Sequence, residues 1–324
     1  MNIVIIGLGS MGKRRARLIK AIDEKINVYG VDTSISRCEE AEKLGIKTFN
    51  SINNAVQNIK IDASFVCTSP LSHNKIISEL LDNNISVFSE INLVSDGYSE
   101  NIAKAKDKNL TLFMSNTMLY RNEIKYIKKS IQDFNAPVNY VYHVGQYLPD
   151  WHPWESYKDF FVGDKRTNGC RELFGIEFPW LFDIFGIAEI IAVEKRNISK
   201  LEINFPDSYY LLLKHKDGTL GTIVADVVSP KAVRNFECFG DGLHLFWEGN
   251  PKALYKYNNE TKEKEYINTY ESFEQLKQYS DNVVETAFAE EIINYFNVLN
   301  KTQEPKHTFE KDLICINLMD KIEG

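Results

Sequence analysis

Short apolar runs alternate with amphipathic stretches through the first third of the chain. Between the runs lie segments with helical periodicity, such as 11–22 and 72–84. A nearly continuous apolar run is typical of a parallel strand covered on both faces. The alternation predicts an α/β domain with a doubly wound parallel sheet over residues 1–118. The runs predicted as strands are 2–7, 27–32, 63–68, 85–90 and 110–115.

After about residue 119 the apolar positions alternate with polar ones along longer segments separated by short turns. The segment 214–222 predicts a β-hairpin, because its Asp-Gly pair supplies the backbone angles of a tight turn. Helical patterns cover about 171–186 and 289–299, and we expect the apolar side of the latter in a core. Residues 119–324 are therefore predicted to form an α+β domain with a mostly antiparallel, open sheet. Its predicted strands lie within 138–148, 189–198, 208–215, 218–228, 234–240 and 242–249.

Composition places the chain among ordinary globular proteins. It has 324 residues, 44% hydrophobic and 26% charged, with a net charge of −7. This balance predicts neither a nucleic-acid partner nor an anionic membrane surface, and no apolar run reaches the ~18 residues of a membrane span. The five cysteines are scattered without metal-like spacing, so we expect a reducing, cytoplasmic location and no metal.

A glycine motif follows the first predicted strand. Gly7, Gly9 and Gly12 fit the spacing GxGxxG at the start of a helix, and Asp32 ends the second strand twenty residues later. This arrangement predicts a Rossmann-type dinucleotide site in which the helix N-terminus meets the phosphates. Asp32 favours NAD over NADP, because its charge would repel a 2′-phosphate. Nearby Arg37 and Arg14 could soften that repulsion, so NADP stays possible. The predicted cofactor contacts here are Gly7, Gly9, Ser10, Met11, Gly12, Asp32 and Arg37.

The sequence resembles the Gfo/Idh/MocA family of glucose–fructose oxidoreductases and inositol dehydrogenases. The resemblance rests on four segments: 6–15, 67–81, 87–93 and 168–186. It implies an NAD(P)-binding Rossmann domain, a second domain that carries substrate residues and often an oligomer interface, and a sugar, cyclitol or nucleotide-sugar substrate. It also implies that Thr68, Ser69, His73 and Glu90 line the cofactor. Alternatively, His73 is a helix-start residue with a satisfied ring.

Two departures from the family pattern affect its proton-handling residues. Glu90-Ile91-Asn92 stands where relatives carry Glu-Lys-Pro, and Glu172 and Ile176 match the family's Asp and His on the helix near 171–186. Both proton-transferring side chains are therefore isoleucines here. Without the proline, a cis bond before Asn92 would cost about 3 kcal/mol, so we predict a trans bond and a rebuilt loop.

The segment 145–166 offers replacement groups, because it combines aromatic anchors with titratable side chains. His152 is the first choice as general base because its ordinary pKa lies near neutral pH, followed by Tyr157 and then Glu172. Simple structural packing is the alternative for each of the first two. The side chains expected to bind substrate are Trp151 and Trp154, by stacking, and Lys158 and Arg171, by charge. The segment also resembles family members associated with bacterial surface-sugar biosynthesis.

Two functions follow from these features. The first is an NAD(P)-dependent oxidoreductase, or an epimerase working through transient oxidation, on a nucleotide sugar or a nonulosonic (sialic-acid-like) sugar. The second is a non-catalytic sensor that binds the dinucleotide, which Ile91 and Ile176 favour. By analogy with the family, a homo-oligomer, dimer or tetramer, is expected.

Overall fold

The computed structural model describes residues 1–152, 155–271 and 283–324, which form two compact units. Unit 1 comprises Met1–Thr117 and Phe288–Ile314, and unit 2 comprises Met118–Ala287 and Cys315–Gly324. The first change of unit falls next to the predicted boundary at residue 118. The segment Phe288–Ile314, which the sequence pattern places in the second domain, clusters with unit 1 instead. In the described part of the chain, no helix has the length and apolarity needed to cross a membrane.

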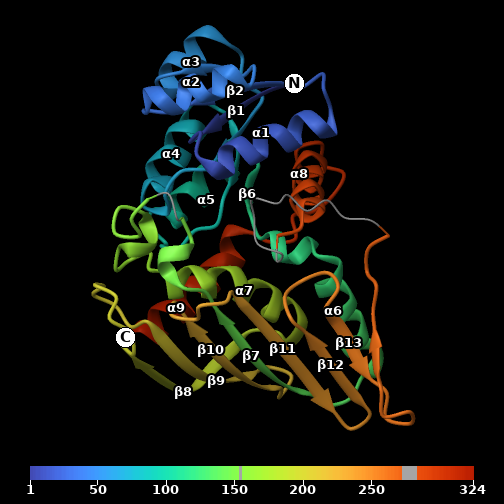
Figure 1. Cartoon of the computed structure of the whole chain (residues 1–324). Coiled ribbons are helices and arrows are strands. Elements are labelled where there is room, and N and C mark those ends of the chain that lie inside the picture. The colour runs from blue at the N-terminus through green and yellow to red at the C-terminus, as the bar shows by residue number, and fades with distance from the viewer. Residues whose placement is uncertain (153–154, 272–282) are drawn as a thin grey trace. The chain divides into compact units, whose positions relative to one another are not determined.

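Unit 1 is built on a six-stranded parallel sheet in the order β3-β2-β1-β4-β5-β6 (Figure 1). Its five predicted strands are confirmed, and the three-residue β3 was not predicted. The strands are β1 (Asn2–Ile6), β2 (Asn27–Val31), β3 (Lys47–Phe49), β4 (Ala63–Val66), β5 (Ser86–Ser89) and β6 (Leu112–Met114). The helices between them are α1 (Ser10–Ile22), α2 (Ile35–Lys43), α3 (Ile52–Asn58), α4 (Pro70–Asp82) and α5 (Tyr98–Asp107).

The core of unit 1 includes a ring cluster over three neighbouring strands. Phe65, Phe88 and Phe113 occupy paired positions on β4, β5 and β6 and are fully buried. Tyr295, from helix α8 (Glu285–Leu299), packs against all three with ring centroids 5.2–5.4 Å apart. The expected helix at 289–299 is confirmed, and its apolar side completes the core that the parallel sheet begins.

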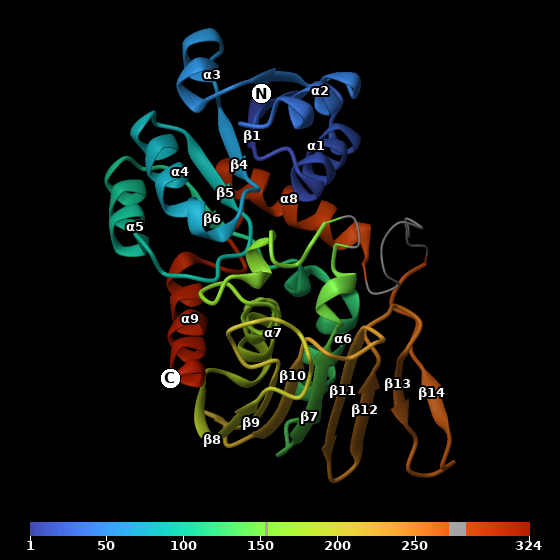
Figure 2. The same ribbon diagram turned by 60° about the vertical axis from the view of Figure 1, so that its left-hand side comes forward.

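Unit 2 contains an eight-stranded sheet in the order β14-β13-β12-β11-β7-β10-β9-β8, antiparallel except for the β7–β10 pair. The predicted hairpin is confirmed as the β9–β10 pair. Helices α6 (Asn122–Phe134) and α7 (Gly169–Phe185) lie against the sheet (Figure 2), and α9 (Phe309–Glu323) ends the chain. The strands are β7 (Asn139–Gly145), β8 (Ala188–Arg196), β9 (Ser208–His215), β10 (Leu220–Asp226), β11 (Val233–Gly240), β12 (Leu243–Trp247), β13 (Leu254–Tyr257) and β14 (Lys264–Tyr266). The predicted fold class is thus confirmed.

Candidate functional site

Two glycines of unit 1 have no room for a side chain. Gly7 has a φ of +92°, and a Cβ there would lie 2.7 Å from the carbonyl oxygen of Cys67. A Cβ on Gly12 would lie 1.9 Å from the carbonyl oxygen of Gly7. The turn between β1 and α1 is therefore so tight that the helix begins directly against the sheet.

Gly9 differs from both, because a Cβ at this position would meet no atom within 4 Å. Gly9 is also the N-cap of α1 and provides no side-chain cap. The first N–H groups of a helix have no partner within it and carry partial positive charge. The open space over Gly9, which precedes Ser10 and Met11 in the first turn of α1, therefore fits the pyrophosphate of a dinucleotide.

Asp32 connects the end of β2 to the glycine turn. Its Oδ2 accepts a hydrogen bond from the Leu8 backbone N–H at 2.8 Å, and its Oδ1 accepts one from the Ser34 N–H at 2.8 Å. Each carboxylate oxygen has a second lone pair, so Asp32 can still accept from ribose hydroxyls. Arg37 Nη1 lies 3.9 Å from Asp32 Oδ2, and that side chain is 54% exposed. Arg14, the other arginine considered as a charge partner for Asp32, is instead buried against the Phe288 ring.

The segment after β4 is held by a buried histidine. His73 has its Nε2 2.9 Å from the Thr68 carbonyl oxygen and its Nδ1 2.7 Å from the Asn92 side-chain amide. Burial lowers the pKa of His73 and keeps the ring neutral. Since the carbonyl can only accept, Nε2 carries the proton, and the Asn92 NH₂ group can donate to Nδ1 after a half-turn of the amide. Ser69 begins helix α4 as its N-cap.

The Glu90–Ile91–Asn92 loop is fastened at both ends. Glu90 accepts hydrogen bonds from the guanidinium of Arg15, and the Asn92 side chain meets His73. The predicted trans bond before Asn92 is confirmed, since the described residues contain no cis peptide. Ile91 lies between the two anchored side chains and is partly exposed. Two polar anchors thus replace the rigidity that a proline would give.

In unit 2, Glu172 stands in the first turn of α7, whose N-cap Asn168 accepts a hydrogen bond from the Arg171 N–H at 2.9 Å. Burial raises the pKa of Glu172 to about 8, and the nearby Arg234 partly opposes this. Its Oε2 is buried and has no hydrogen-bond partner among the described residues. A buried carboxyl without a partner, and with a pKa near operating pH, is typical of a proton-transfer group.

Arg234 on β11 is a residue that the sequence reasoning missed. Its Nε donates to Glu177 Oε1 at 2.8 Å, while the Tyr142 hydroxyl and the Trp180 indole donate to Glu177 Oε2 at 2.7 and 2.6 Å. Glu177 thereby fixes the guanidinium in one orientation. The sequence could have indicated this residue. Arg234 is two positions from Phe236 in an alternating strand pattern, so it lies on the same face as that buried ring. A cation at such a position needs a partner or a ligand.

The segment 145–166 contains all the remaining predicted residues except Arg171, and most of them are in local contacts. The His152 imidazole meets Glu155 Oε1 at 2.5 Å and lies 3.9 Å from the Phe160 ring centroid. The Tyr157 hydroxyl accepts from the Glu202 N–H at 3.3 Å, and Lys158 pairs with the Glu202 carboxylate. Trp154 lies outside the described residues.

Two other predicted substrate contacts have internal partners. The Trp151 indole N–H donates to the Gln146 carbonyl oxygen at 3.3 Å. Arg171 forms ion pairs with Asp320 and Glu323 of α9, each at 2.5 Å. Arg171 therefore connects α7 to the C-terminal helix within unit 2. Within the described ranges, no group of three or more histidine, cysteine or acidic side chains is arranged to hold a metal ion.

The sheet order of unit 1, with a tight glycine turn after β1 and Asp32 after β2, defines a dinucleotide-binding protein of the Rossmann class. Comparison with known families is consistent with this geometry. Residues 1–115 match GFO_IDH_MocA, described as "Oxidoreductase family, NAD-binding Rossmann fold". This match over residues 1–115 confirms the resemblance to the Gfo/Idh/MocA family and the NAD cofactor predicted from the motifs.

Individual relatives extend the likeness beyond this domain. Myo-inositol 2-dehydrogenase of Thermotoga maritima is 26% identical over 234 residues, which are 69% of this chain and 67% of that protein. UDP-N-acetylglucosamine 3-dehydrogenase GnnA of Acidithiobacillus ferrooxidans has a TM-score of 0.77 at 15% identity, over 100% of this chain and 96% of that one. The WlbA dehydrogenase of Bordetella pertussis was solved with NADH and UDP-GlcNAcA. It has a TM-score of 0.78 at 15% identity, over 99% of this chain and 94% of that one. The last two likenesses show a shared fold.

Proposed function

We propose that this protein is an NAD-dependent oxidoreductase acting on a hydroxyl group of a sugar derivative, or an epimerase that oxidises such a hydroxyl transiently. The observation that carries the proposal is the half-buried Glu172, whose Oε2 is buried without a partner among the described residues, in a chain whose glycine turn fits a dinucleotide. Relatives that act on myo-inositol and on UDP-N-acetylglucosamine support a substrate of this class. A nucleotide sugar or a nonulosonic sugar is the form we propose.

The proposed oxidation requires two transfers from the substrate, that of a hydride and that of a proton. NAD, when bound, supplies the hydride acceptor. Glu172 takes the proton of the reacting hydroxyl during oxidation and returns it during reduction, which Ile91 and Ile176 cannot do. Because the pKa of Glu172 is about 8, both protonation states are accessible near neutral pH. His152 and Tyr157 stay as alternative proton acceptors.

Arg234 is the group we propose for substrate orientation. Its Nε donates to Glu177 at 2.8 Å, its guanidinium also meets the Tyr142 hydroxyl, and its side chain is 19% exposed. The guanidinium has further N–H groups in a fixed planar fork, which suits hydroxyl, carboxylate or phosphate oxygens. Lys158 and Arg171, in contrast, already form ion pairs with carboxylates of the chain.

The variant Glu172→Gln tests the proposal. We expect kcat/KM for sugar oxidation to fall by about 10²–10⁴-fold, the usual contribution of a positioned acid or base. In the native protein the oxidation rate should rise with pH through about 8, as Glu172 loses its proton, and the reverse reduction should fall over the same range. The variant should lose this dependence. The measurement is absorbance of reduced nicotinamide across a pH series with a panel of nucleotide and nonulosonic sugars.

Asp183→Asn provides a matched control, because Asp183 is an exposed carboxyl on the same helix, paired with Lys128 at 2.8 Å. It should keep native kinetics. If Glu172→Gln retained both the native rate and the native pH profile, Glu172 would not be the proton acceptor, and His152→Ala and Tyr157→Phe would be measured next.

The second candidate function is a non-catalytic dinucleotide sensor, which the aliphatic side chains of Ile91 and Ile176 favour. A sensor should bind NADH in a fluorescence titration yet reduce no NAD with any sugar of the panel. Sugar-dependent reduction of NAD that Glu172→Gln abolishes would exclude it.

A further inference from the structure

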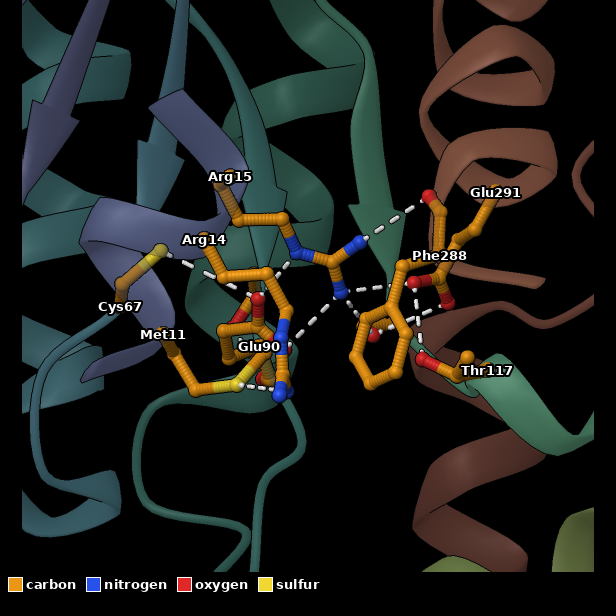
Figure 3. Close-up of polar contacts among 10 residues, drawn as sticks. Met11, Arg14, Arg15, Cys67, Glu90, Thr117, Phe288 and Glu291 are labelled. Carbon is orange, nitrogen blue, oxygen red and sulfur yellow. Dashed lines mark hydrogen bonds and ion pairs between the residues drawn. The ribbon is translucent and has the colours of Figure 1, made fainter. Parts of the chain in front are cut away.

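Arg15 is a fully buried arginine on α1 that lies between two glutamates from distant parts of unit 1 (Figure 3). Its Nε donates to Glu90 Oε1 at 2.6 Å, and its Nη2 donates to Glu291 Oε2 at 2.7 Å. Nη2 also reaches Glu90 Oε2 at 3.2 Å and Ser115 Oγ at 3.3 Å, and Nη1 reaches the Phe288 carbonyl at 3.4 Å. One guanidinium thus connects three segments of the chain.

This Arg15 cluster lies at the ends of the strands that face a dinucleotide in a Rossmann sheet. Glu90 directly follows β5, and Ser115 directly follows β6. Cys67 directly follows β4, and its Sγ lies 3.9 Å from Glu90 Oε1. Arg15 stands three residues after Gly12 of the glycine turn. Ligands of such sheets bind outside the carboxyl ends of the strands, so the cluster supports the backbone that meets the cofactor.

Glu90 and Glu291 share the guanidinium of Arg15, and a second cation, Arg14, lies over the nearby Phe288 ring. The exposed fractions of the side chains are 0% for Arg15, 11% for Glu90 and 0% for Glu291. Two buried negative charges beside one positive charge leave an excess that desolvation makes costly. Burial raises the pKa of Glu291; Arg15 opposes the shift and Glu90 adds to it. Glu291 is therefore the carboxyl that takes up a proton most readily.

The partners of Glu291 tolerate either protonation state. Ser115 Oγ lies 3.0 Å from Glu291 Oε1, and Thr117 Oγ1 lies 3.1 Å from Oε2. A hydroxyl donates to a charged carboxylate and accepts from a protonated one, so both contacts survive a change of charge. Glu90 has no comparable hydroxyl pair in the cluster and is held by two guanidinium hydrogen bonds.

Cys67, Tyr295 and Arg14, near Glu291, each keep one protonation state near neutral pH. Burial raises the pKa of the Cys67 thiol and of the Tyr295 phenol well above their usual ranges, so both remain neutral. Arg14 lies over the Phe288 ring, 4.6 Å from its centroid, and remains a cation (Figure 3). The groups that surround Glu291 are thus Arg14 and Arg15 of α1, Cys67 after β4, Glu90 after β5 and Tyr295 of α8.

We propose that Arg15 is a positioning residue for the cofactor site, and that its hold on the Glu90–Asn92 loop is complete only when Glu291 carries a proton. With Glu291 neutral, the guanidinium serves Glu90 alone as its counter-ion and keeps the loop against α1. With Glu291 charged, two carboxylates share the Arg15 guanidinium, and these three groups together carry a net negative charge beside a site for an anionic dinucleotide. Affinity for NADH should therefore fall as pH rises. This inference needs cofactor binding alone and does not depend on the proposed sugar reaction.

Glu291→Gln is the decisive variant, because it keeps the shape of the side chain and fixes it in the uncharged form. NADH is titrated by its nicotinamide fluorescence between pH 5 and 9, without any sugar. We expect the native dissociation constant to rise about 3- to 30-fold from the acidic to the basic end of this series, the size of effect carried by residues that act through a network. Glu291→Gln should bind as tightly as the native protein at the acidic end and stay nearly constant to the basic end.

The neighbouring variants separate positioning from general packing. Glu90→Gln should weaken NADH binding about 3- to 30-fold at the acidic end of the series, because it removes the carboxylate that Arg15 holds on the loop. Arg15→Lys should restore part of the affinity that Arg15→Met loses. Glu40→Gln, an exposed carboxyl of unit 1 paired with Lys13 at 2.7 Å, is the matched control and should behave as the native protein. Thermal melting of each variant verifies that it is folded.

Three results would overturn the proposal: a folded Glu291→Gln with the native pH dependence, equal effects of Glu90→Gln and Glu291→Gln at the acidic end of the series, or a native affinity that does not change with pH. Since Glu291→Gln is uncharged and similar in shape, it decides the question even if Arg15→Met does not fold.

Discussion

Single residues of the glycine turn serve two separate purposes. Gly7 and Gly12 lack a side chain because neighbouring backbone occupies the space, whereas Gly9 lacks one beside open space. The first two glycines are thus required by the fold, and the third is required only if a ligand approaches. A pair of alanine substitutions separates these purposes in one protein.

We expect Gly12→Ala to destabilise the protein by at least about 1–3 kcal/mol, because its methyl group would overlap the Gly7 carbonyl oxygen. Gly9→Ala should leave the melting temperature unchanged, since its φ of −70° suits alanine, but weaken NADH binding about tenfold by filling the space over the helix end. Thermal unfolding and NADH fluorescence measure the two effects. Normal NADH binding by Gly9→Ala would show that the phosphates bind elsewhere.

The individual site residues differ in how far the sequence could predict them. The glycines and Asp32 follow from local spacing, and Glu172 follows from its match to a family position. Arg15 could not be found this way, because its partners lie 75 and 276 positions away and only the fold brings them together. For the same reason Glu90, which we predicted as a cofactor contact, has its carboxylate directed to Arg15.

At the scale of elements, the loop after β5 shows how a rigid connection survives without proline. Asn92 is 2% exposed and meets a histidine that is 1% exposed, so each satisfies a buried polar atom of the other. Asn92→Ala should destabilise the protein by about 1–3 kcal/mol, because it leaves buried His73 Nδ1 with only the Ser89 hydroxyl at 3.4 Å. Urea unfolding measures this, with the exposed Asn50→Ala as control.

A variant Asn92→Ala as stable as the control would show that the contact with His73 contributes nothing to the loop. The contact also bears on the two interpretations of His73, as a cofactor contact or as a helix-start residue with a satisfied ring. In the structure both ring nitrogens have partners within the chain. The interpretation as a helix-start residue with a satisfied ring describes this geometry, while its contact with the cofactor stays a prediction.

Strands within apolar runs were predictable, whereas short strands that contain polar residues were not. Every strand predicted in the first domain is a buried apolar run, and β9 was predicted with the bounds Ser208–His215. The three missed strands, β3, β13 and β14, have only three or four residues and contain lysines. Such segments carry too few alternations to show a period, and their pairing with longer neighbours makes them strands.

At the scale of the whole molecule, the C-terminal part of the chain completes the N-terminal unit. Tyr295 fills the core above Phe65, Phe88 and Phe113, and Glu291 pairs with Arg15. That the segment from residue 288 belongs to unit 1 was not predictable, because no change in composition marks this position. The helical pattern at 289–299 indicated a core-facing side, yet periodicity cannot say which core receives it.

Truncation tests this dependence. A chain that ends at residue 283 retains the glycine turn and the whole parallel sheet, but leaves the ring cluster uncovered and Arg15 without Glu291. We expect it to show no cooperative unfolding of unit 1 and no NADH binding, and a separately added peptide of residues 284–324 to restore binding in part. Native affinity in the truncated chain would mean that the returning helix is dispensable.

The packing of the C-terminal segment Phe288–Ile314 in unit 1 has a consequence for biosynthesis. Domains generally fold in the order in which the ribosome releases them, N-terminal first. Here the parallel sheet emerges early, yet the aromatic ring and the counter-charge that finish it arrive only after about nine-tenths of the polypeptide has been translated. The nascent nucleotide-binding domain must therefore wait, with apolar surface uncovered, until translation is nearly over.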